Sequence, residues 1–158
     1  MVNNITVINK RNIWVTSDSH FSHTNILRFK DKNGDLIRGS KFNSISEHDW
    51  YMVEKWNSVV KPQDKVYHLG DVYMSATKGY IENILSHLNG HKRLILGNHD
   101  NGKDQILQRY FEKIDVWRKF PEFGLLLTHI PVHPSTLGEA RFGTHTLNVH
   151  GHIHHNKS

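Results

Sequence analysis

The chain has 158 residues, enough to bury a core in one domain spanning residues 1–158, and no cysteine, which excludes disulfides and thiolate metal sites. Its formal net charge of +5 would attract anionic substrates, while no apolar run approaches the roughly 18 residues of a membrane span. We therefore expect a cytoplasmic protein without a membrane partner, in which any transition-metal site would use the 14 histidines together with Asp and Asn.

The first half of the chain predicts a strand and two helices. The apolar run 13–17 is typical of a buried strand, and 22–29 predicts a short helix. Residues 30–43 are charged and contain glycine, so we expect a loop there. A capping box that begins at Ser44 opens a long helix, which Pro62 ends.

The second half alternates strands and helices before its pattern changes. We expect, in chain order, a strand at 65–69, a helix at 79–88, a strand at 92–96 and a helix at 104–111. From residue 113 the period favours two antiparallel strands joined through Pro121 and Glu122. This order predicts an α/β fold of mixed sheets covered by helices.

Five short apolar runs are each followed at once by Asp, Asn or His. The residues at these strand ends are Asp18, His20, Asp71, Asn98, His99, Asp100, His129, His152 and His154. Each motif alone is weak, but five of them in order at strand ends are hard to explain by chance. Because open α/β sheets place their chemistry at the carboxyl ends of strands, we expect these side chains to converge.

The ordered set resembles the calcineurin-like metallophosphoesterases, and most closely their small bacterial and phage members. The matching stretches are TSDSHFSH at 16–23, WNSVVKP at 56–62, VYHLGD at 66–71, LNG at 88–90 and GNHD at 97–100. The resemblance extends from Trp14 to His154. It implies a sandwich of two mixed β-sheets flanked by helices, with two divalent metal ions at the strand ends.

The resemblance also implies the metal ligands. It assigns Asp18, His20, Asp71 and His154 to one ion, and Asp71, Asn98, His129 and His152 to the other. Asp71 would bridge the pair, because a carboxylate has two oxygens and an imidazole cannot serve two ions in this way. Imidazole, carboxylate and amide donors without sulfur suit manganese first, with iron, zinc or nickel as alternatives.

His99 is not needed as a ligand once Asn98 is one. The resemblance implies that His99 contacts the phosphate and protonates the leaving oxygen, while Asp100 either orients His99 or caps the following turn. Further residues that could contact substrate or support the ligands are His23, Asn25, His68, Asp100, His133 and Arg141. Arg28 or Arg38 could replace Arg141 as the cation that contacts phosphate.

These residues predict a dinuclear metal-dependent phosphoesterase that cleaves phosphomonoester or phosphodiester bonds by attack of metal-bound hydroxide. Nucleotides or cyclic nucleotides are the expected substrates. The alternatives are a nuclease that acts on DNA or RNA, and a catalytically inactive binding module of the same fold. The chain ends four residues after His154, where such relatives usually continue. It is either a natural minimal version or lacks part of one sheet's edge, which would leave an open edge for a partner such as a second copy in a homo-oligomer.

Overall fold

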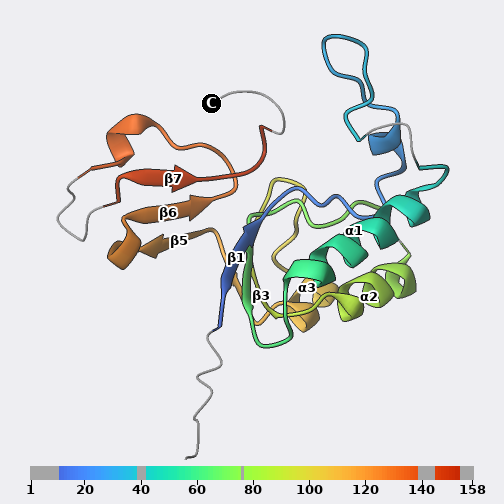
Figure 1. The fold of residues 1–158 in the computed structure, drawn as a ribbon. Helices are drawn as coiled ribbons and strands as arrows, with labels where there is room; N and C mark the ends of the chain where they lie inside the picture. The colour runs from blue at the N-terminus through green and yellow to red at the C-terminus, as the bar shows by residue number, and fades with distance from the viewer. Residues whose placement is uncertain (1–10, 39–41, 76, 139–144, 154–158) are drawn as a thin grey trace, which may run out of the picture.

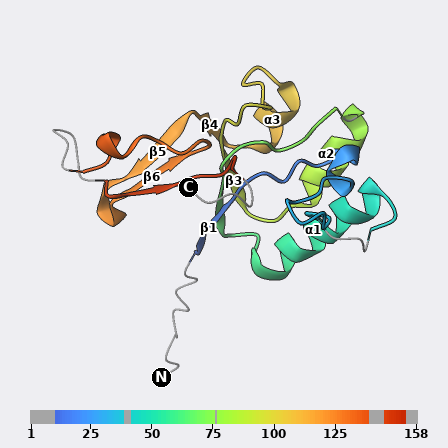
Figure 2. The same cartoon turned by 90° about the horizontal axis from the view of Figure 1, so that it is seen from above.

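The computed structural model describes residues 11–38, 42–75, 77–138 and 145–153. The fold is α/β and contains a four-stranded sheet, a three-stranded sheet and three α-helices within these residues (Figure 1). Both views place the helices on one side of the four-stranded sheet and the three-stranded sheet on the other (Figures 1 and 2). No helix in the described ranges is both long and apolar enough to cross a membrane.

The four-stranded sheet is parallel throughout. Its strands are β1 (Ile13–Thr16), β2 (Lys65–His68), β3 (His91–Ile95) and β4 (Lys113–Asp115), in the order β1-β2-β3-β4. The expectation of two mixed sheets is therefore wrong for this sheet. The reason is that a helix crosses over between each pair of successive strands, which returns the chain to the same end of the sheet.

Three helices cover one face of this sheet. They are α1 (Ile45–Val59), α2 (Lys78–His87) and α3 (Gln105–Tyr110). The predicted capping box is confirmed, because the Ser44 side chain accepts a hydrogen bond of 3.1 Å from the Glu47 N–H. Val53, Ile84 and Leu107 from the three helices share a buried cluster with Leu94 of β3. Burial of these apolar side chains holds the helices against the sheet.

The three-stranded sheet is mixed. Its strands are β5 (Trp117–Phe120), β6 (Leu125–Thr128) and β7 (Leu147–Val149), with β5 antiparallel and β7 parallel to β6. The strand expected just after residue 113 is in fact two strands, β4 and β5, which belong to different sheets. The break lies at Val116, a residue that is 68% exposed. A second buried cluster contains Tyr67 and Ile95 of the first sheet with Phe120 and Leu127 of the second.

Short 3₁₀ helices complete the described elements. They are η1 (Thr24–Leu27), η2 (Pro121–Phe123) and η3 (Pro134–Thr136). The helix predicted at 22–29 is thus a single shorter 3₁₀ turn. In the predicted loop, an isolated bridge joins Lys30 to Leu36 around Gly34, whose φ of +88° favours glycine.

Candidate metal centre

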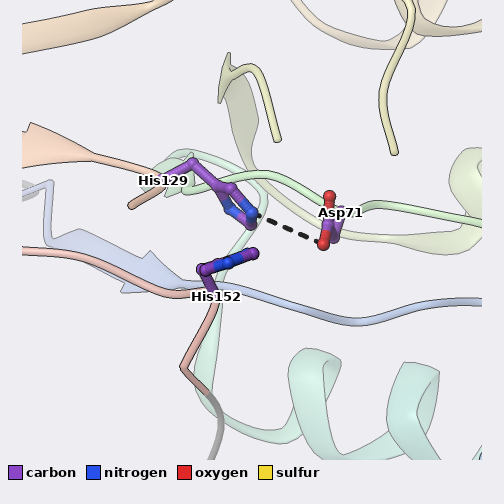
Figure 3. Close-up of side chains that lie close together, drawn as sticks. All are labelled: Asp71, His129 and His152. Carbon is purple, nitrogen blue, oxygen red and sulfur yellow. Dashed lines mark ion pairs between the residues drawn. The ribbon is translucent and has the colours of Figure 1, made fainter. Parts of the chain in front are cut away.

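The carboxyl ends of β1, β2 and β3 lie at one edge of the parallel sheet, because Thr16, His68 and Leu94 are paired in register. The motifs that follow these strands therefore meet in space. Two groups of three side chains come together there, each with its ligand atoms within 4.8 Å of one another. One group is Asp18, His20 and Asp71, and the other is Asp71, His129 and His152. Figure 3 shows the second group, with His129 and His152 turned toward Asp71.

One oxygen of Asp71 faces both groups. Its Oδ2 lies 3.8 Å from His20 Nε2 and 3.4 Å from His129 Nε2. The other oxygen, Oδ1, accepts a hydrogen bond of 2.9 Å from the His99 backbone N–H. The carboxylate is 2% exposed, so these contacts fix its orientation.

The spacing of the donors fits divalent ions. Ligand atoms bound at about 2.0–2.2 Å to one ion lie roughly 3–4 Å apart. His20 Nε2 is 3.7 Å from Asp18 Oδ1, and the two Asp71 distances also fall within this range. Asn98 joins the second group, because its Oδ1 is 2.9 Å from His129 Nε2. Six of the seven predicted ligands therefore converge, and the seventh, His154, lies outside the described residues.

The backbone at the ligands is strained. Four of the six described non-glycine residues with positive φ are predicted ligands, namely Asp18, His20, Asp71 and His152, with φ between 46° and 68°. Such conformations cost free energy for residues with a Cβ and persist where the surrounding structure enforces them. Strain of this kind concentrates at functional sites, and here it coincides with the predicted ligands.

Glycines allow the ligand loops to approach one another closely. A Cβ on Gly97 would collide with the carboxylate and the backbone N of Asp71. A Cβ on Gly151 would overlap Ser17 and the Asp18 carboxylate. The loop after β7 is thereby held against the first motif, where the His152 N–H donates to Asp18 Oδ2 at 3.0 Å.

The Asp100 carboxylate joins two loops, a role that neither of its predicted alternatives, orienting His99 or capping the following turn, describes. Its carboxylate accepts hydrogen bonds from the N–H groups of Asp71 (2.8 Å), Val72 (3.0 Å) and Gly97 (2.8 Å). These bonds join the loop after β2 to the loop after β3. Asp100 therefore positions the shared ligand Asp71 through its backbone.

The charges of the site favour a bound cation. Burial opposes ionisation of Asp71, but the hydrogen bonds from His129 and from the His99 N–H outweigh it and lower the pKa. At His129 burial also opposes the charged form, which by itself would lower the pKa. The adjacent Asp71 carboxylate outweighs this effect, so the pKa of His129 is raised. Two carboxylates, Asp18 and Asp71, thus lie in a site where positive charge is stabilised.

His99 and His23 line the same cavity as the ligands. This cavity of about 320 Å³ is bounded by His20, Asp71, Asn98 and His152 together with His23, Ile26, Phe29 and His99. The His99 ring lies 5.8 Å from that of His20, and the His23 ring lies 5.4 Å from that of Phe29. Burial, followed by the neighbouring His20 and His99, lowers the pKa of His23.

Three other predicted residues do not line the cavity that contains the ligands. His68 is buried, and its Nε2 lies 2.9 Å from the Ser19 hydroxyl, so it supports the loop between two ligands. His133 is exposed and caps η3 by accepting from the Ser135 N–H at 3.2 Å. Asn25 is an exposed residue of η1. Arg141 lies outside the described residues.

Two residues near Asp18 have roles that the sequence pattern did not assign. The Ser17 hydroxyl donates to the Asp18 carboxylate and to the Leu69 carbonyl. Arg38, expected as an alternative phosphate contact, donates instead to the Asp18 backbone carbonyl at 2.8 Å. A hydroxyl residue directly before a strand-end Asp was the available signal for Ser17, whereas the position of Arg38 depends on tertiary contacts.

Comparison with known proteins places the chain in a family. The chain is 31% identical to the Gene 66 protein of Mycobacterium phage L5, over 90% of this chain and 77% of that protein. The chain belongs to the family of this Gene 66 protein. It is also 30% identical to the uncharacterized protein MJ1445 of Methanocaldococcus jannaschii, over 92% of this chain and 71% of that protein. No family model matches the chain.

A solved structure with a similar level of sequence identity supports the fold. The protein of unknown function AQ665 from Aquifex aeolicus superposes with a TM-score of 0.61 and is 30% identical in sequence. The match covers 77% of this chain and 62% of that one, so the chain spans less than two thirds of the solved protein.

Proposed function

We propose that the chain is a metal-dependent phosphoesterase that holds two divalent ions and hydrolyses phosphomonoester or phosphodiester bonds of nucleotides or cyclic nucleotides. The observation that carries this proposal is that two groups of Asp and His side chains share the Asp71 carboxylate. We also propose that the two sheets form a metallophosphoesterase-like sandwich, because Tyr67 and Leu127 of different sheets share a buried cluster.

Six described residues would hold the ions. One ion would be held by Asp18, His20 and Asp71, and the other by Asp71, Asn98, His129 and His152. When bound, the two ions supply positive charge for the phosphoryl oxygens and activate water at neutral pH. Manganese suits this donor set, with iron, zinc or nickel as alternatives. The hydrogen bond from the His99 N–H to Asp71 Oδ1 leaves Oδ2 turned toward both positions.

His99 is the proposed general acid. Its imidazole lines the cavity that contains Asp71 and Asn98, so a ring N–H can reach an ester oxygen of a phosphate placed there. It would donate its proton to the leaving oxygen as the phosphorus–oxygen bond breaks, which is the task an imidazole performs near neutral pH. His23 lines the same cavity and would contact the phosphate or its substituent.

The proposal is tested by a substrate screen on protein reconstituted with Mn²⁺. The substrates are p-nitrophenyl phosphate, bis-p-nitrophenyl phosphate, 2′,3′-cyclic nucleotides and short oligonucleotides. We expect hydrolysis of at least one ester, abolished by chelation and restored by metal. Cleavage of oligonucleotides would favour the nuclease alternative, which the net charge of +5 also suits. No turnover with any metal would leave the inactive binding module as the better reading.

A further inference from the structure

A second and larger cavity lies beside the metal centre. Its volume is about 690 Å³, and its floor is one face of the pair β5 and β6. Trp117 and Thr128 are paired there in register, as are Lys119 and Leu126, and all four line the cavity. Phe120 belongs instead to the buried cluster shared with the other sheet.

The two cavities adjoin at the metal ligands. Asn98 lines both of them, and His129 lines the larger one while belonging to the second ligand group. The smaller cavity, of about 320 Å³, is lined by the predicted ligands His20, Asp71, Asn98 and His152, so under the proposed function the phosphate would bind there. The space next to a phosphate bound there, on the side of Asn98 and His129, is the larger cavity.

The walls of the larger cavity suit a planar organic group. Pockets of a few hundred to about 1,000 Å³ with mostly apolar walls are typical sites for small molecules. Trp117 is 53% exposed and Ile130 is also 53% exposed, although both line the cavity. The Lys119 ammonium lies 5.2 Å from the centre of the Trp117 ring. An exposed indole offers a stacking surface, and the cation beside it favours a ligand with negative charge.

We propose that this cavity binds the aromatic or heterocyclic substituent of the phosphate ester, a nucleobase in a nucleotide substrate, and that Trp117 determines specificity by stacking on it. The inference rests on the proposed function, because the metal centre is what places the phosphate beside the cavity. A substrate without a planar group would then lose affinity even though its phosphate is held in the same way.

The test compares two ligands that differ only in the base. Each is a stable phosphonate in which carbon replaces the bridging ester oxygen, one the analogue of adenosine 5′-monophosphate and the other the analogue of ribose 5-phosphate. Their affinities for the Mn²⁺-loaded protein are measured by calorimetry. We expect the wild type to bind the adenosine phosphonate at least about tenfold more tightly than the ribose phosphonate. Trp117→Ala should lower this ratio of affinities by about 5- to 150-fold, with unity as the lower limit.

Two further variants serve as controls. Phe123→Ala removes another aromatic side chain, 61% exposed and outside the cavity lining, and should keep the wild-type ratio. Trp117→Phe retains a stacking ring and should keep most of the wild-type ratio of affinities. Thermal unfolding of each variant checks that it folds.

Three results would overturn the inference. They are a ratio near one in the wild type, an unchanged ratio in Trp117→Ala, and a ratio that collapses in Phe29→Ala instead, which would place the base in the smaller cavity. Hydrolysis of bis-p-nitrophenyl phosphate and of the other esters in the screen by the same preparations separates the two proposals. Turnover with a ratio near one rejects the base pocket alone, whereas a Trp117-dependent ratio without turnover on any ester rejects the phosphoesterase.

Discussion

Gly97→Ala is the substitution that most directly tests how the ligand loops are packed. A Cβ at this position would lie 2.9 Å from the carboxylate carbon of Asp71, and closer still to its backbone N and Oδ1. Ordinary contacts begin near 3.4 Å, so Asp71 or the Gly97 backbone next to Asn98 would have to move by at least about 0.5 Å (3.4 minus 2.9). Metal–ligand distances tolerate only about 0.2 Å. We therefore expect Mn²⁺ affinity to fall by at least about tenfold.

The same variant should lose stability, because crowding a packed site costs about 1–3 kcal/mol, or roughly 2–12 °C in Tm for a chain of this length. Calorimetric titration with Mn²⁺ and thermal unfolding of the metal-free protein measure the two effects separately. Gly79→Ala is the matched control. Gly79 lies in α2 with nothing within 4 Å of its added Cβ, so this change should raise stability by up to about 1 kcal/mol and leave metal affinity unchanged. Wild-type metal affinity in Gly97→Ala would refute the reasoning.

Three other substitutions test separate parts of the account. Asp100→Ala leaves three backbone N–H groups without their acceptor, and we expect the free energy of unfolding to fall by about 2–4 kcal/mol in denaturant titrations; a change below 0.5 kcal/mol, on the order of a surface substitution, would contradict this role. Burial lowers the pKa of His68 to about 4, so the unfolded chain takes up its proton first as pH falls and stability should decrease from about pH 6.5 to 4. His68→Gln should lose less stability than the wild type over that pH range. An identical slope of stability against pH in the two proteins would contradict this role of His68. His99→Gln should keep both metal-binding events while turnover drops by about 10²–10⁴-fold, most strongly on alkyl esters with poor leaving groups; unchanged kcat on such esters would reject the acid role.

The convergence of the ligands was predictable because of a rule about sheets. Asp18, Asp71 and Asn98 each follow a short apolar run, and successive strands linked by helices end at the same edge. The sequence alone therefore indicates which side chains meet. The helix start at Ser44 was equally local, since a capping box depends on residues three apart.

The parts that were not predicted depend on contacts between distant residues. The run after residue 113 is expected to form one strand although Trp117 and Arg118 break its alternation, yet Asp115 pairs with β3 while Trp117 pairs with β6. The bonds from Asp100 to the loop after β2 span 28 and 29 residues. The cavity beside Trp117 likewise forms only when β5 is placed next to the loop that carries Asn98. No local periodicity encodes these arrangements.

A crystal structure of the protein grown with Mn²⁺, with the ions located by anomalous scattering, tests the central claim most directly. We predict two ions about 3.5–4 Å apart with the Asp71 carboxylate bound to both, one completed by Asp18 and His20 and the other by Asn98, His129 and His152. A single ion, or two ions that share no ligand, would contradict the account.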